Sequence, residues 1–112
     1  MKYLFLVCVE EPFEADPADI DSTAWVDEMD RRGARLLGNR VADPRDATTV
    51  RVRGGEVLLT DGPYVETKEW LGGFAVVDVP DDEAAKVWGG KIAEACGWPH
   101  EIRRFKPQPR AE

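Results

Sequence analysis

The sequence predicts a single α+β domain, on three observations. Two strongly apolar stretches, Tyr3–Val9 and Leu71–Val79, have the length and the aliphatic and aromatic content of buried strands. Two segments with apolar residues at helical spacing each follow a strand. Several shorter, more polar strands complete the order. At 112 residues, such a domain can bury a core without a metal or a disulfide.

The first half of the chain adds a helix and three strands to the opening strand. The helix is predicted over Ala18–Arg32 and the second strand over Ala34–Val41. The segments Thr48–Arg53 and Glu56–Thr60 alternate between apolar and polar residues. Gly54-Gly55 joins them, and this pattern is typical of a two-residue β-hairpin.

The second half repeats the strand–helix–strand pattern. Asp81 is the predicted N-cap of the second helix, and Gly97 is its predicted end. Gly89-Gly90 lies inside this helix, at a cost of about 1 kcal/mol per glycine relative to alanine. Such a cost is tolerable where a helix must approach a sheet closely. A last strand is predicted over His100–Phe105, and residues 107–112 are expected to form a flexible tail.

Without the hairpin, the order is βαββαβ, which is the ferredoxin-like pattern. Its connection rules place Tyr3–Val9 and Leu71–Val79 at the centre of the sheet and the other two strands at its edges. Two helices cover one face of such a sheet, yet both central strands are apolar on both faces. No remaining segment can cover the second face, so we expect two copies to pack sheet against sheet as a homodimer.

Composition excludes several classes of function. The net charge of −7 disfavours nucleic-acid binding, and no apolar run is long enough to span a membrane. Cys8 and Cys96 lie on apolar faces outside any Cys-x-x-Cys motif, which predicts thiols in a reducing, cytoplasmic compartment. With His100 as the only histidine, we expect no metal site and no cofactor. Seven arginines between positions 31 and 53 could bind an anion, but pairing with nearby acids is the favoured interpretation.

The segment between the hairpin and the second apolar strand is the best candidate for a functional site. It combines a turn sequence, an aromatic side chain, carboxylates and a lysine. Asp61 and Tyr64 are the candidate catalytic residues, as acid or base and as hydrogen-bond donor to a ligand carbonyl. The candidate ligand-binding residues around them are Glu66, Lys68, Glu69, Trp70, Gly72 and Gly73.

Each of these residues also has a purely structural interpretation. Asp61 could fix the turn through an Asx-type bond from its side chain to the backbone, and this interpretation is favoured. Tyr64 could anchor its loop by packing its ring. Lys68 and its flanking glutamates could form a surface ion-pair cluster of little energetic weight. Gly72-Gly73 could serve a β-bulge or a close backbone approach.

Several motifs together resemble the YCII-related family, in particular its branch with the DGPF motif. The resemblance extends from the opening Met1-Lys2-Tyr3 to Glu101-Ile102-Arg103. Its most specific part is Asp61-Gly62-Pro63-Tyr64, followed by Glu66–Glu69 and Leu71-Gly72-Gly73-Phe74. It implies one domain over residues 1–106 and a dimeric α+β barrel of two ferredoxin-like sheets. It also implies genomic association with extracytoplasmic-function sigma factors.

The chain departs from the family pattern at two points. Tyr64 stands where the motif has Phe and adds a hydroxyl group. His100 does not match the histidine of the His–Asp pair found in a related branch, so that pair is not carried over. Asp61 is the member of the pair that the resemblance can supply.

Two classes of function follow from these observations. The first is a small-molecule binding protein or a cofactor-free enzyme of undefined reaction, with its site near Asp61. The alternative is a non-catalytic accessory or regulatory module that binds a sigma factor. In that case the acidic segment Glu10–Pro17 would face a basic surface on the partner.

Overall fold

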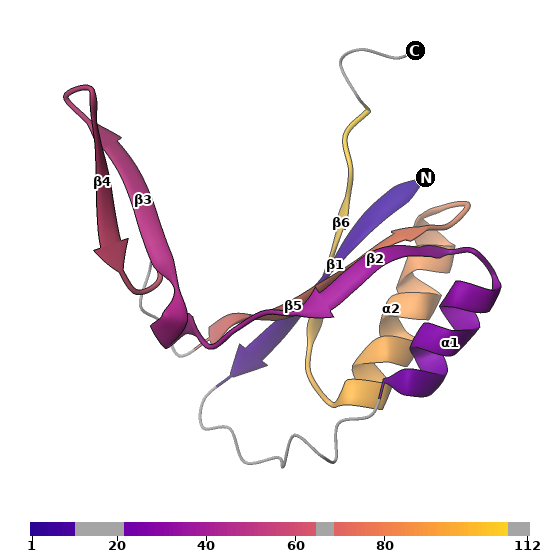
Figure 1. The fold of residues 1–112 in the computed structure, drawn as a ribbon. Helices are drawn as coiled ribbons and strands as arrows, with labels where there is room; N and C mark the ends of the chain where they lie inside the picture. Colours follow the sequence, from indigo (N-terminus) through magenta and orange to yellow (C-terminus); the bar gives the residue numbers. More distant parts are fainter. Residues whose placement is uncertain (11–21, 65–68, 108–112) are drawn as a thin grey trace.

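The fold is α+β, as the sequence predicts (Figure 1). The computed structural model describes residues 1–10, 22–64 and 69–107, without the side chains of Glu10 and Glu69. In chain order the elements are β1 (Lys2–Glu10), α1 (Thr23–Arg31), β2 (Arg35–Arg40), the 3₁₀ turn η2 (Pro44–Asp46), β3 (Thr48–Arg53), β4 (Glu56–Asp61), β5 (Glu69–Asp78), α2 (Asp82–Cys96) and β6 (His100–Arg104).

Four of the strands form one antiparallel sheet in the order β2-β5-β1-β6. The two apolar strands are therefore central and the two arginine-bearing strands are at the edges, so the predicted topology is confirmed. In the central pair, Leu4 lies opposite Val76 and Leu6 lies opposite Phe74. The register shifts after Val7, where Gly72 is the extra residue of a β-bulge.

Both helices pack against the same face of the sheet (Figure 1). Tyr3 and Phe5 of β1 and Val77 of β5 are at most 2% exposed there. Met29 of α1 and Ala85 of α2 meet them from the helix layer. Alternate residues of the central strands thus build one continuous core, as the period of two along a strand requires.

The first helix begins at Thr23, whereas the sequence predicted a start at Ala18; residues 18–21 lie outside the described part of the chain. Ser22 occupies the N-cap position, and its carbonyl accepts the first helical bond, from Val26 N–H at 3.0 Å. The predicted caps of α2 are confirmed. The Asp81 side chain accepts from Ala84 N–H, and Gly97 ends the helix with a φ of 76°.

Strands β3 and β4 form a separate two-stranded sheet, which we call the arm (residues 48–61). The predicted two-residue turn joins them, with φ of 58° at Gly54 and 80° at Gly55, values that suit glycine. The arm extends away from the four-stranded sheet (Figure 1). As a result the radius of gyration is 16.3 Å, against about 13 Å for a compact chain of this length.

The sheet face opposite the helices, which we call the open face, is apolar. It is formed by alternate residues of the central strands and by Leu37 of the edge strand β2. Leu37 is 58% exposed, and the central residues on this face are half-buried: Leu4, Leu6, Phe74 and Val76. No described segment of the same chain covers them as the helices cover the other face.

Gly89 and Gly90 of α2 have different surroundings. A Cβ at Gly89 would lie 2.6 Å from Ile102 Cδ1, so this glycine permits the close approach of helix and sheet that the sequence analysis anticipated. A Cβ at Gly90 would meet nothing within 4 Å.

This difference predicts unequal effects of two neighbouring substitutions. Gly90→Ala should raise the free energy of unfolding by about 0.5–1 kcal/mol, because alanine is the better helix former and fills open space. Gly89→Ala should give a smaller gain or none, because its methyl group must displace the Cδ1 end of Ile102, and that cost offsets the gain in helix propensity. Urea denaturation of both variants measures these changes. Equal shifts would contradict this account of the helix–sheet contact.

Candidate functional site

The predicted site residues Asp61 and Tyr64 bound a turn at the root of the arm, which we call the DGPY turn (residues 61–64). Gly62 has a φ of 105°, and its N–H donates to the carbonyl of Ala47 at 2.7 Å. The carbonyl of Gly62 accepts from the hydroxyl of the buried Thr49 at 2.8 Å. Two hydrogen bonds to the glycine thus hold the turn against the start of β3.

The Asp61 carboxylate takes no part in holding this turn. Asp61 is exposed, and among the described residues no backbone N–H or side chain donates a hydrogen bond to it. The Asx-type bond that the structural interpretation required is therefore not formed there. The carboxylate remains available to solvent or to a ligand.

Tyr64 is 74% exposed, so its ring does not pack into the body of the protein. The guanidinium of Arg51 lies over the ring, with Cζ 5.2 Å from the ring centroid. This is a cation–π contact between β3 and the turn. It joins a phenol and a guanidinium, whereas Asp61 lies on the other side of the arm, because Arg51 is an odd number of residues from Thr48, the partner of Asp61. The sequence analysis did not assign Arg51 to the site.

A seven-residue connection, residues 41–47, joins β2 to β3, and a backbone hydrogen bond at each of its ends links it to β5 and to the DGPY turn. At one end, Val41 N–H donates to the carbonyl of Gly72 at 3.0 Å, and at the other, Ala47 accepts from Gly62. Neighbouring chain segments leave no room for a side chain at Gly72 or at Gly73. A Cβ at Gly72 would lie 2.4 Å from a methyl group of Val9, and one at Gly73 would lie 2.9 Å from the Asn39 carbonyl.

The remaining predicted residues are only partly described. Trp70 is half-buried in β5 opposite Val9. Glu69 pairs with Glu10 through its backbone, and its side chain is outside the described part. Glu66 and Lys68 also lie outside the described residues, so their roles stay predictions.

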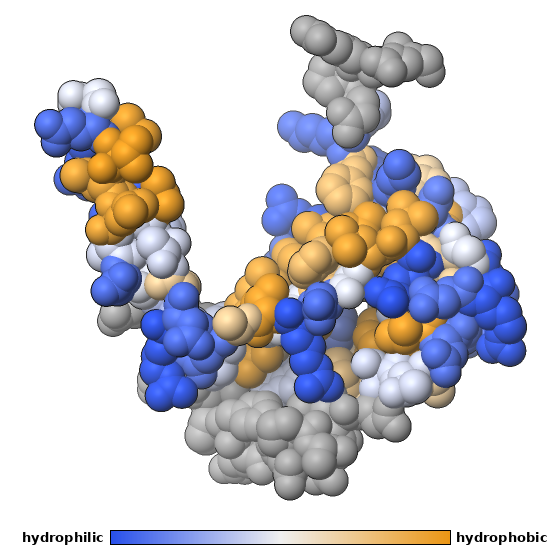
Figure 2. Space-filling view, in the orientation of Figure 1, coloured by the Kyte–Doolittle hydropathy of each residue, from blue (hydrophilic) through white to orange (hydrophobic). Residues whose placement is uncertain are grey.

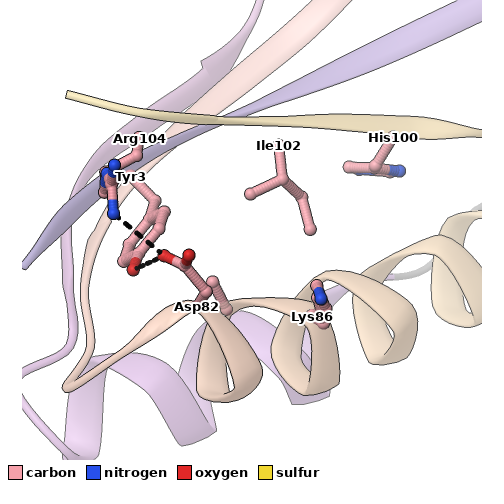
Figure 3. Close-up of a pocket in the computed structure, with 7 residues that line it drawn as sticks. Tyr3, Asp82, Lys86, His100, Ile102 and Arg104 are labelled. Carbon is pink, nitrogen blue, oxygen red and sulfur yellow. Dashed lines mark hydrogen bonds and ion pairs between the residues drawn. The ribbon is translucent and has the colours of Figure 1, made fainter.

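A hollow of about 430 Å³ lies between α2 and the edge of the sheet (Figure 3). The Tyr3 hydroxyl donates to Asp82 at 2.5 Å, and Arg104 lies 3.7 Å from the same carboxylate. Burial, together with the Asp82 acceptor, raises the pKa of Tyr3 to about 12. No sequence pattern marks this group, because its members are far apart along the chain. The lining residues are Tyr3, Asp82, Ala85, Lys86, His100, Ile102 and Arg104.

The polar groups of this hollow are engaged with the protein itself. Asp82 joins Tyr3 to Arg104, and Lys86 pairs with Glu83 at 3.1 Å. The two contacts of Asp82 fasten the first turn of α2 to β1 and β6, and the Lys86–Glu83 pair lies within the helix. The hollow therefore has a structural role, whereas the DGPY turn presents a carboxylate without a partner among the described residues.

His100 lies at the other end of the hollow from Asp82 (Figure 3). Its Nδ1 is 3.0 Å from the carbonyl of Trp98, so this nitrogen carries the proton and donates. Its Nε2 lies 3.9 Å from Sγ of the buried Cys96. Burial lowers the pKa of His100, and the bond to Trp98 opposes that shift.

Four of the seven arginines between positions 31 and 53 pair with acids, so the favoured interpretation is confirmed for these four. Arg31 and Arg32 contact Glu28, Arg35 contacts Asp30 at 3.0 Å, and Arg45 contacts Asp43 at 3.0 Å. Asp43 also caps η2, and its bonds to Arg45 lower its pKa. These pairs leave no cluster of unengaged arginines at positions 31–45 of the described chain.

Neither a metal centre nor a membrane span is formed by residues 1–10, 22–64 and 69–107. Those residues contain no group of three or more histidines, cysteines or acids close enough to hold a metal ion. Within the same ranges, no helix has the length and apolar character needed to cross a bilayer.

Comparison with known proteins shows the family. The YCII-related domain matches residues 1–96, so the chain belongs to the YCII-related family. An uncharacterized protein of Rhizobium meliloti is 34% identical over 79 residues, which cover 56% of this chain. The match spans 64% of the length of that relative, a little under two thirds. Membership of the DGPF branch stays a prediction from the motif.

The lowered pKa of His100 predicts a pH dependence of stability. The unfolded chain takes up a proton at this residue near the usual pKa of about 6.5, but the folded chain resists it. Acidification through that pKa should therefore reduce the free energy of unfolding. His100→Gln removes this contribution, so its stability should fall less than that of the wild type between pH 7.5 and 5. Urea titrations at several pH values measure the difference, and parallel pH profiles would contradict it.

Proposed function

We propose that this chain is a small-molecule binding protein, or a cofactor-free enzyme, whose site lies at the DGPY turn with Asp61 as acid or base. One observation carries the proposal: the Asp61 carboxylate is exposed and has no hydrogen-bond partner among the described residues, although two other bonds hold the turn. A carboxylate that the fold does not use is available for binding or proton transfer.

The neighbouring groups suit a ligand that carries a carbonyl or carboxylate oxygen. Arg51 supplies a fixed positive charge, and the Tyr64 hydroxyl supplies a hydrogen-bond donor beside it. Arg51 is on the side of the arm opposite to Asp61, so this pair would help to bind the ligand from beyond the carboxylate. Asp61 could remove a proton from the carbon next to such a carbonyl. An isomerisation, an elimination or a lyase-type step would fit this arrangement. The reaction needs no cofactor.

We also propose that the functional unit is a cytoplasmic homodimer in which two open faces meet and form a dimeric α+β barrel. The support is physical. Leu4, Leu6, Phe74 and Val76 form an apolar surface on the sheet that no described segment of their own chain covers. Burial of a continuous apolar surface against a symmetry-related copy is the simplest way to remove it from water.

Substitution on the open face should weaken the dimer. Leu37→Lys places a charge on the exposed edge of this face and should raise the dimer dissociation constant at least tenfold. Val87→Lys is the matched control, because Val87 is similarly exposed, at 56%, but lies on α2. Sedimentation equilibrium measures both constants. A wild-type monomer at micromolar concentration would refute the homodimer.

Thermal-shift screening of a metabolite library tests the site. A ligand should raise the melting temperature of the wild type and of Glu56→Gln, a control at the far end of the arm. It should not raise that of Asp61→Asn. If binding and turnover survive in a folded Asp61→Asn protein, the acid–base role of Asp61 is wrong.

A screen without any ligand would favour the regulatory module that binds a sigma factor. Most of the acidic segment proposed for that contact, residues 11–17, lies outside the described residues. Charge reversal of Glu10, Glu11 and Glu14 should then abolish co-purification with the partner.

A further inference from the structure

We propose that the arm of each chain packs its apolar side against a second copy of this chain, and that this contact completes the site at Asp61. The inference rests on the homodimer proposed above and adds to it a second interface, made by the arm. The argument uses the composition of the arm, its isolation within the chain and the register of its strands.

The arm has one apolar side. Val50 lies opposite Leu59, and Val52 lies opposite Val57, so these four residues point to the same side of the two-stranded sheet. All four are strongly exposed, by 60% for Val50, 69% for Val52, 66% for Val57 and 70% for Leu59. The other side carries Arg53 and Glu56 opposite each other. Such segregation is typical of a sheet with one buried face.

The rest of the chain, as far as the structure describes it, does not provide that buried face. Strands β3 and β4 make extensive contacts only with each other. The described bonds between the arm and its surroundings are at the root, where Gly62 meets Ala47 and Thr49. A single two-stranded hairpin is at best marginally stable in water. The arm therefore needs a partner surface to stay ordered along its length.

The shape of the molecule indicates where that partner sits. In Figure 2 the apolar side chains of the arm face the wide gap between the arm and the rest of the molecule, and polar ones lie on its outer side. The open face is a second uncovered apolar surface of the same chain. Since a two-fold dimer uses the same surfaces on both copies, one partner can cover both surfaces of each chain.

The register brings Asp61 into the same contact. Asp61 pairs with Thr48, two positions beyond the pair of Leu59 with Val50, so it belongs to the apolar side of the arm. A second copy packed on Leu59 thus extends over the Asp61 carboxylate and shields it from water. Each site is then made by the turn of one chain and the covering surface of the other, which suits a group meant to exchange protons.

Two adjacent substitutions test the proposal. Leu59→Lys and Thr60→Lys add the same charge at neighbouring positions on opposite sides of the arm. Sedimentation equilibrium should show at least a tenfold higher dimer dissociation constant for Leu59→Lys and little change for Thr60→Lys. In the wild type, amide hydrogen exchange of residues 50–59 should slow as the concentration rises through the dissociation constant. Circular dichroism verifies that both variants are folded.

Other results would overturn the inference and separate it from the homodimer. Equal dissociation constants for the two lysine variants, with Leu37→Lys still weakening the dimer, would refute the role of the arm and leave the sheet interface intact. Fast exchange along the arm in a fully dimeric wild type would refute it as well. A wild-type monomer would refute both proposals together.

Discussion

The pairing of β1 with β5 is the constraint on which the rest of the structure depends. These strands run antiparallel through the middle of the sheet, and each is apolar on both faces. On one face, Tyr3, Phe5 and Val77 require cover, and the two helices supply it. On the other face the same periodicity sets Leu6 beside Phe74, and residues 1–10, 22–64 and 69–107 form no third layer over them. The two most apolar strands, β1 and β5, thus bury one of their faces within the described chain and leave the other face exposed.

Much of the fold could be predicted because local signals and connection rules agree. The glycine pair at positions 54 and 55, the N-cap at Asp81 and the end at Gly97 are short-range signals, and the structure follows them. The start of α1 at Thr23 was missed because Ala18 and Ser22 continue the helical spacing of Trp25 in the sequence, and spacing alone does not locate a cap. The separation of the arm from the sheet depends on tertiary contacts, and a hairpin pattern in the sequence does not predict these contacts.

The candidate site also has a part that could be predicted from local sequence and a part that depends on contacts between distant residues. The turn sequence could be read directly, because Asp-Gly-Pro is local chemistry, and Asp61 and Tyr64 do bound a turn. The bonds that hold that turn come from Ala47 and Thr49, which the sequence does not mark as its partners. Arg51 reaches Tyr64 only because β3 and β4 are paired. The Tyr3–Asp82–Arg104 group likewise depends on three elements meeting at one end of the sheet.

The arm also has a consequence for the solubility of the chain. A two-stranded sheet has two edges whose backbone groups have no neighbouring strand, and here those edges border an uncovered row of valine and leucine side chains. Such edges are templates for uncontrolled strand addition between molecules. Arg51, Arg53 and Glu56 place charges on the outer side, in the manner of gatekeeper residues. A chain whose apolar arm is uncovered is therefore prone to aggregate, and a high concentration of such chains during expression raises the rate of that aggregation.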